Sequence, residues 1–163
     1  MIVKCIDIYN ESTKQYLYDN TDSYLTKNHH YNVLEIMFTT RGIYYRIISD
    51  RAGMRSISFI TRAKDFEIVS NKIPPSWILD KKFSDLSPAS WMDISLWQES
   101  FWQDLDANRP KAVQCYRDEI KAMIALDKEY IQVMIDERSK NDKMITWNET
   151  MIPLFNEVLE GGL

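Results

Sequence analysis

The chain of 163 residues is long enough for one domain with its own hydrophobic core, and its 45% apolar and 27% charged side chains are typical of a soluble globular protein. It has only four glycines, two of them at the C-terminal end, which excludes the glycine-rich phosphate loops of P-loop and dinucleotide-binding proteins. The net charge of -4 resides in the second half, because residues 1–70 carry 9 basic and 8 acidic side chains while residues 71–163 carry 11 and 16.

The compartment is predicted from the cysteines and from the N-terminal sequence. Cys5 and Cys115 lie far apart in the chain, which favours two free thiols in a reducing compartment over a disulfide scaffold. The first residues do not show the charged start and apolar run of a secretory signal. We therefore expect a cytoplasmic protein.

Residues 1–70 have the short, β-branched, alternating segments of an antiparallel sheet. Strands are predicted over 1–9, 31–39, 43–49, 54–60 and 66–69, with turns at Thr-Thr-Arg-Gly and Ser-Asp-Arg-Ala-Gly and a long polar loop over 10–28. Five short strands joined mostly by tight turns indicate a small, strongly bent antiparallel sheet or a barrel, and a small β-barrel is the fold we expect.

The stretch 73–106 holds four of the five tryptophans, and large rings belong where two layers of structure meet. We interpret it as a hydrophobic seam between the β half and the helices; its rings are Trp77, Phe83, Trp91, Trp97, Phe101 and Trp102. Pro74 and Pro75 end the β half, and Ser76 is predicted to cap a short helix that runs to Phe83.

The rest of the chain has helical periodicity. Helices are predicted from Ser87 and Pro88 to about 105, from Pro110 to about 139, and from Asn148 to about 159. Asp127 interrupts the apolar stripe of the longest helix. It is either a buried carboxylate bonded to a tyrosine or tryptophan, or the point where the helix leaves the core, and we favour the second. The expected fold is α+β, with a β half (1–70) and a helical half of three to four helices (71–163) packed as one unit.

Two constellations that resemble catalytic sites are assigned structural roles. The adjacent His29 and His30 do not have the spacing of a metal site, and they are predicted to be a solvated pair in a polar loop. An enzyme would have to recruit one of them. Asp118, Glu119 and Lys121 superficially resemble a nuclease pattern, but on a helix they face different sides, so we interpret them as a solvated face. No catalytic residue, cofactor or metal ligand is predicted.

Basic and aromatic residues are interleaved in the β half, as in proteins that bind single-stranded nucleic acid. The set comprises Arg41, Tyr44, Tyr45, Arg46, Arg51, Arg55, Phe59, Arg62 and Lys64. Local acids cancel most of this charge, so a nucleic-acid-binding module is kept as the alternative function and nucleic acid is not the partner we favour.

The acidic side chains of the helical half have two possible roles. Most are explained by solubility, but some are predicted to form a surface complementary to a basic protein. The set comprises Asp104, Asp106, Asp118, Glu119, Asp127, Glu129, Asp136 and Glu137.

Several short stretches together resemble a known group of bacterial proteins. They are Y-N-V-L-E-I (31–36), G-I-Y-Y-R-I-I-S-D (42–50), F-E-I-V (66–69), I-P-P-S-W (73–77), L-S-P-A-S-W (86–91) and F-W-Q-D-L-D (101–106). The chain resembles the immunity proteins of contact-dependent growth inhibition and related polymorphic toxin systems. The resemblance implies a small SH3-like β domain joined to helices, which binds one cognate toxin domain and occludes its active site.

The function expected from the sequence is therefore that of a non-enzymatic immunity protein. Its toxin is expected to be a basic nuclease domain, because an acidic inhibitor imitates the phosphates that such a domain binds. The predicted partner contacts are Asp104, Asp118, Glu119, Asp136 and Glu137.

Overall fold

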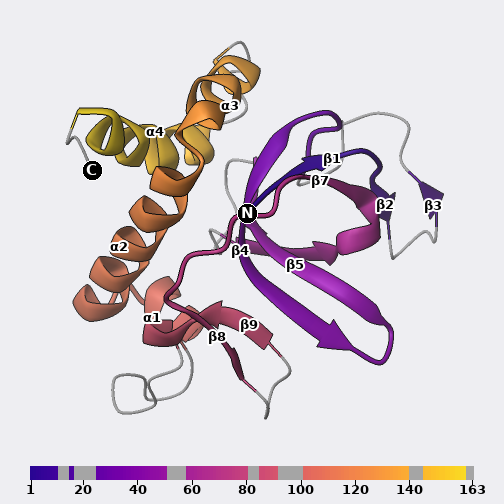
Figure 1. Cartoon of the computed structure of the whole chain (residues 1–163), viewed down its shortest axis with the longest axis horizontal. Coiled ribbons are helices and arrows are strands. Elements are labelled where there is room, and N and C mark those ends of the chain that lie inside the picture. The colour runs from indigo at the N-terminus through magenta and orange to yellow at the C-terminus, as the bar shows by residue number, and fades with distance from the viewer. Residues whose placement is uncertain are drawn as a thin grey trace.

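The computed structural model describes residues 1–10, 15–16, 25–50, 58–80, 85–91, 101–139 and 145–160. These residues form an α+β structure in which an antiparallel sheet precedes and packs beside a group of helices (Figure 1). The predicted fold class and the order of the two halves are confirmed.

The strands of the larger sheet are short except for the central pair. They are β1 (Ile2–Cys5), β4 (His30–Thr39), β5 (Gly42–Ile48), β6 (Ser58–Arg62), β7 (Phe66–Ser70), β8 (Trp77–Asp80) and β9 (Asp85–Pro88). A separate two-stranded ladder joins β2 (Tyr9–Asn10) to β3 (Gln15–Tyr16). The helices are α1 (Phe101–Asp106), α2 (Pro110–Leu126), α3 (Ile131–Arg138) and α4 (Ile145–Glu160), and 3-10 turns lie at η1 (Ala63–Asp65), η2 (Ala89–Trp91) and η3 (Lys128–Tyr130).

Strand β4 is the centre of the sheet. Its partner on one edge is β5, and its other edge pairs first with β1 and then with β9. The main path runs β6-β5-β4-β1-β7, and β8 joins it through β9. The turn between β4 and β5 is the predicted Thr-Thr-Arg-Gly turn, where Gly42 has a φ of 129°, in the region that favours glycine.

The predicted closed barrel is not confirmed. Among the described strands, β6 and β7 stand at the two ends of the main path and do not pair with each other, so the sheet is open. Within the described residues the larger sheet has seven strands instead of the five predicted, because β8 and β9 come from the stretch assigned to helices.

The predicted helices from Ser76 and from Ser87 are both wrong at their starts. Trp77 to Asp80 is a strand, and its cross-strand partners are the four residues that end at Pro88. Ile36 of β4 pairs with Leu86, so a partner about fifty residues away in sequence supplies the hydrogen bonds that override local helix signals. Only α1 remains of the second helix within the described residues, and Trp97 and Phe83 lie outside them.

Pro110 begins α2 as predicted, since a missing N–H costs nothing at the first helical position. The long helix predicted to reach residue 139 is divided at Asp127 into α2 and α3. The last helix begins at Ile145, so Asn148 lies inside α4 and is not its cap.

Of the predicted seam rings that the structure describes, Trp91, Phe101 and Trp102 form one aromatic cluster, and Trp77 is buried apart from these ring contacts. Trp91 stacks on Phe101 with ring centres 4.6 Å apart, and Trp102 meets Trp91 edge-on at 5.1 Å. Tyr116 of α2 lies 6.1 Å from Trp91, so the cluster connects η2, α1 and α2. In the part of the chain that is described, no helix has both the length and the apolar character needed to cross a membrane.

Candidate functional site

A buried ion pair joins the two halves of the molecule. Arg138, the last residue of α3, is 0% exposed, and its Nε donates to Oδ1 of Asp50 at 2.8 Å. Its Nη2 donates to the backbone oxygen of His30 at 2.8 Å. Tyr31 donates its hydroxyl hydrogen to Oδ2 of Asp50, and its ring lies 4.9 Å from the guanidinium carbon. The end of β5, the start of β4 and the end of α3 therefore meet at one charged cluster.

The electrostatics of this cluster follow from burial and from the arginine. Burial by itself would raise the pKa of Asp50, but the charge of Arg138 and the hydrogen bonds from Arg138 and Tyr31 outweigh it and lower that pKa. Burial and then the Asp50 charge raise the pKa of Tyr31 well above its ordinary value. Asp50 is therefore ionised at neutral pH, and the phenol of Tyr31 beside it is neutral.

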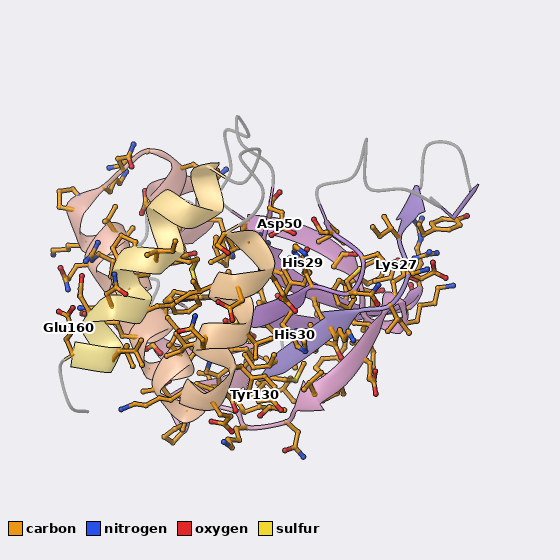
Figure 2. All side chains as sticks on the ribbon, turned by 90° about the horizontal axis from the view of Figure 1, so that it is seen from above. Lys27, His29, His30, Asp50, Tyr130 and Glu160 are labelled. Atoms are coloured by element: carbon orange, nitrogen blue, oxygen red, sulfur yellow. The ribbon has the colours of Figure 1, made fainter. Side chains whose placement is uncertain are left out.

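The two histidines belong to the same junction. His30 donates its backbone N–H to Oε2 of Glu137 at 2.8 Å, and its Nδ1 lies 2.6 Å from Oε1 of the same carboxylate. The Nδ1 atom of His29 lies 3.6 Å from Oδ2 of Asp50, which is too long for a hydrogen bond. Figure 2 shows His29, His30, Asp50 and Tyr130 along the boundary between helices and sheet.

The prediction of a solvated histidine pair is wrong. The side chains of His29 and His30 are only 15% and 14% exposed, and His30 also faces the ring of Tyr130 at 5.9 Å. Glu137, the partner of His30, lies 107 residues further along the chain, a contact for which the sequence contains no local signal. The hydrogen bonds of this junction hold α3 against β4.

Asp127 forms a second buried polar contact between the halves. It is 1% exposed, and its Oδ1 accepts a hydrogen bond from Ser70 Oγ at 2.6 Å. Lys72 Nζ lies 3.3 Å from the same oxygen, and the Met1 backbone nitrogen lies 3.7 Å from Oδ2. The favoured interpretation, that the helix leaves the core here, is therefore wrong. Burial is the correct alternative, but the donor is a serine.

The five predicted partner contacts do not form one group. Asp104 is 4% exposed and lies 2.6 Å from Nε of Arg109. Glu119 accepts a hydrogen bond from Ser76 Oγ at 2.9 Å, and Glu137 is held at the junction by His30. These three carboxylates are engaged in contacts within the chain.

Asp118 and Asp136 differ from those three because they are exposed. Gln114 Nε2 donates to Oδ1 of Asp118 at 2.9 Å, and Gln132 Nε2 donates to Oδ1 of Asp136 at 2.7 Å. Each carboxylate is thus oriented by an amide one helical turn earlier, which leaves its charge in place. Among the described residues, neither aspartate is in an ion pair.

A cluster that the sequence did not predict surrounds Arg46 of β5 and extends to Asp85 of β9. Glu35 accepts a hydrogen bond from Nε of Arg46 at 2.6 Å, and the guanidinium lies 4.2 Å from the centre of the Trp102 ring. Burial, followed by the charges of Glu35 and Asp80, raises the pKa of Asp85 to about 6. Within the described residues, no group of three histidine, cysteine or carboxylate side chains could hold a metal ion.

The predicted basic and aromatic residues are partly brought together. Arg41, Arg62 and Lys64 line a cleft of about 510 Å³ with Tyr44 and Tyr45, between the start of β5 and the segment from β6 to β7. We call this cleft the basic groove. Arg46 lies elsewhere, in the Glu35 contact, and Arg51 and Arg55 lie outside the described residues.

Comparisons with known proteins add no relative: no protein-family model matches this chain, and no curated protein or solved structure matches it significantly.

Proposed function

We propose that this protein is an immunity protein, which binds a basic bacterial toxin domain in the cytoplasm and occludes the surface that the toxin uses. The proposal includes an SH3-like β half, because the same sequence resemblance implies one. The observation that carries the proposal is the pair of exposed, amide-oriented carboxylates at Asp118 and Asp136.

These two carboxylates suit a binding role for a physical reason. A surface carboxylate that pairs with a lysine or arginine of its own chain presents little net charge to a partner. Glu157 is such a case, because it lies 2.6 Å from Arg117 and also contacts Lys121. Asp118 and Asp136 instead accept from neutral amides, so their full charge is available to steer a basic partner.

The contacts that each carboxylate makes within the chain leave two of the five predicted partner contacts. Asp104 is buried, and Glu119 and Glu137 are bonded within the chain, so their removal would disturb the fold before it disturbed a complex. We therefore assign the partner contact to Asp118 and Asp136, and Asp106, exposed at the end of α1, stays outside the assigned pair.

The test is co-expression of the affinity-tagged protein with the product of the gene next to its own. We expect the neighbouring product to be retained, to be basic, and to be less toxic to the cell when this protein is present. Binding should weaken as salt is raised, because charge pairs across an interface are screened. Replacing both Asp118 and Asp136 by asparagine should lower the affinity roughly tenfold, mainly through the association rate.

The matched control is Asp106→Asn, which removes one exposed charge of the helical half outside the assigned pair. It should change the affinity less than about twofold. The proposal fails if the neighbouring product is neither bound nor neutralised. It also fails in its choice of surface if the double asparagine variant binds as tightly as the unmodified protein.

A further inference from the structure

The basic groove carries a charge opposite to that of the proposed toxin-binding surface. Arg41 and Lys64 are exposed at its rim, one before β5 and the other in η1. Arg62 is held in place because its Nε donates to the buried Asp65 at 3.2 Å and its guanidinium stacks on Tyr9 at 3.6 Å. Among the described residues that line the groove, none is acidic. An anionic group is therefore the complement of its rim.

The walls of the groove are apolar and exposed. Ile43 of β5 is 47% exposed and Ile68 of β7 is 55% exposed. Phe38 is the cross-strand partner of Ile43, so it lies on the same face, and it is 42% exposed. Three large apolar side chains next to two exposed cations indicate a surface that binds an apolar group beside a negative charge.

The floor of the groove distinguishes between two kinds of anionic partner. Tyr45 and Phe66 form the floor and meet edge-on with ring centres 6.1 Å apart. They are only 6% and 7% exposed, so their faces are largely covered by the protein's own core. Binding of single-stranded nucleic acid depends on open aromatic faces on which bases stack. Among the residues that line the groove, the large exposed apolar side chains are Ile43 and Ile68, with Phe38 beside Ile43 outside the lining, and this surface suits aliphatic or aromatic side chains of a peptide.

We propose that the basic groove binds an extended peptide segment of a partner protein, in which an apolar side chain is flanked by carboxylates. The apolar side chain lies between Ile43 and Ile68, and the carboxylates pair with Arg41 and Lys64. This site goes beyond the proposed toxin contact, since it uses the other half of the chain and the other sign of charge.

The test is a display selection of random twelve-residue peptides on the intact protein, followed by fluorescence anisotropy with the enriched peptides. Enriched sequences should combine Asp or Glu with Leu, Ile, Phe or Trp. Their affinity should fall at least tenfold in the double variant Arg41→Glu/Lys64→Glu and several-fold in Ile68→Ser. All three positions are exposed, so these variants should keep the circular dichroism and melting temperature of the unmodified protein.

The matched control is Lys111→Glu, a charge reversal at an exposed lysine of α2, which should leave peptide affinity unchanged. A second probe, a labelled twelve-nucleotide oligo-dT, distinguishes the nucleic-acid alternative. Tighter binding of oligo-dT than of any selected peptide, with loss in the Arg41 and Lys64 variant, would overturn the peptide assignment. So would an absence of enriched peptides, or enriched peptides that bind the double variant as well as the unmodified protein.

Discussion

The guanidinium of Arg138 and the carboxylate of Asp50 meet at 2.8 Å although 88 residues separate them in sequence. Arg138 is completely buried and Asp50 is 3% exposed, so each depends on the other for its charge to be tolerated. This contact fixes the end of α3 against the sheet.

Replacing Arg138 by methionine should destabilise the protein by about 3–5 kcal/mol, because Asp50 is then left as a buried charge without its partner. Urea denaturation measures the change. The double variant Arg138→Met/Asp50→Asn should be more stable than Arg138→Met alone, since it also removes the stranded carboxylate. If the double variant lost as much as the two single variants summed, the two residues would not be coupled.

Acid should destabilise the protein through Asp50. Its pKa is lowered in the folded state, so its contribution to stability is present above the unfolded value of about 3.9 and is lost as pH falls below it towards the folded pKa. The free energy of unfolding, measured from pH 6 to pH 2, should fall less steeply below pH 4 in Asp50→Asn than in the unmodified protein. Equal slopes would show that Asp50 does not carry this dependence.

Asp85 should show the opposite dependence on pH. Its folded pKa of about 6 is raised first by burial and then by Glu35 and Asp80, so stability is lost as pH rises from about 4 through 6. Asp80 is directly opposite Asp85 in the β8–β9 ladder. A carboxyl titration by NMR should give a lower Asp85 pKa in Asp80→Asn, whereas Asp80→Glu, which keeps the charge, should leave it high.

Loss of the Asp127 carboxylate should cost far more than loss of an exposed one. Ser70→Ala removes the hydroxyl donor and should destabilise the protein by about 1–2 kcal/mol, because a buried acceptor loses its hydrogen bond. Asp127→Ala should reduce stability by at least as much, while Asp136→Ala should stay within about 0.5 kcal/mol. Thermal unfolding compares the three, and a neutral Ser70→Ala would mean that water replaces the hydroxyl.

The two cysteines should differ in reactivity. Burial, with the nearby charges of Asp65 and Asp50, raises the pKa of Cys5 to about 12, so almost no thiolate exists at neutral pH. Cys115 is partly exposed on α2. A thiol-reactive dye should label one site quickly in the folded protein and two in denaturant. Rapid labelling of folded Cys115→Ser would contradict the burial of Cys5.

Features set by local chemistry were predictable from the sequence. The antiparallel β half, the Thr-Thr-Arg-Gly turn before β5 and the start of α2 at Pro110 follow from alternation, from the backbone freedom of Gly42 and from the fixed φ of proline. The segregation of acid into the second half is likewise a property of the chain alone.

Only tertiary structure decided the features that depend on distant partners. Trp77–Asp80 and Asp85–Pro88 became the paired strands β8 and β9 because β4 offers an edge to pair with. The buried Asp127 accepts a hydrogen bond from Ser70 of β7, and His30 donates its backbone N–H to Glu137 of α3. Such contacts cannot be predicted from the residues next to each position in the sequence. The free energy that decides burial comes from side chains that the fold brings together.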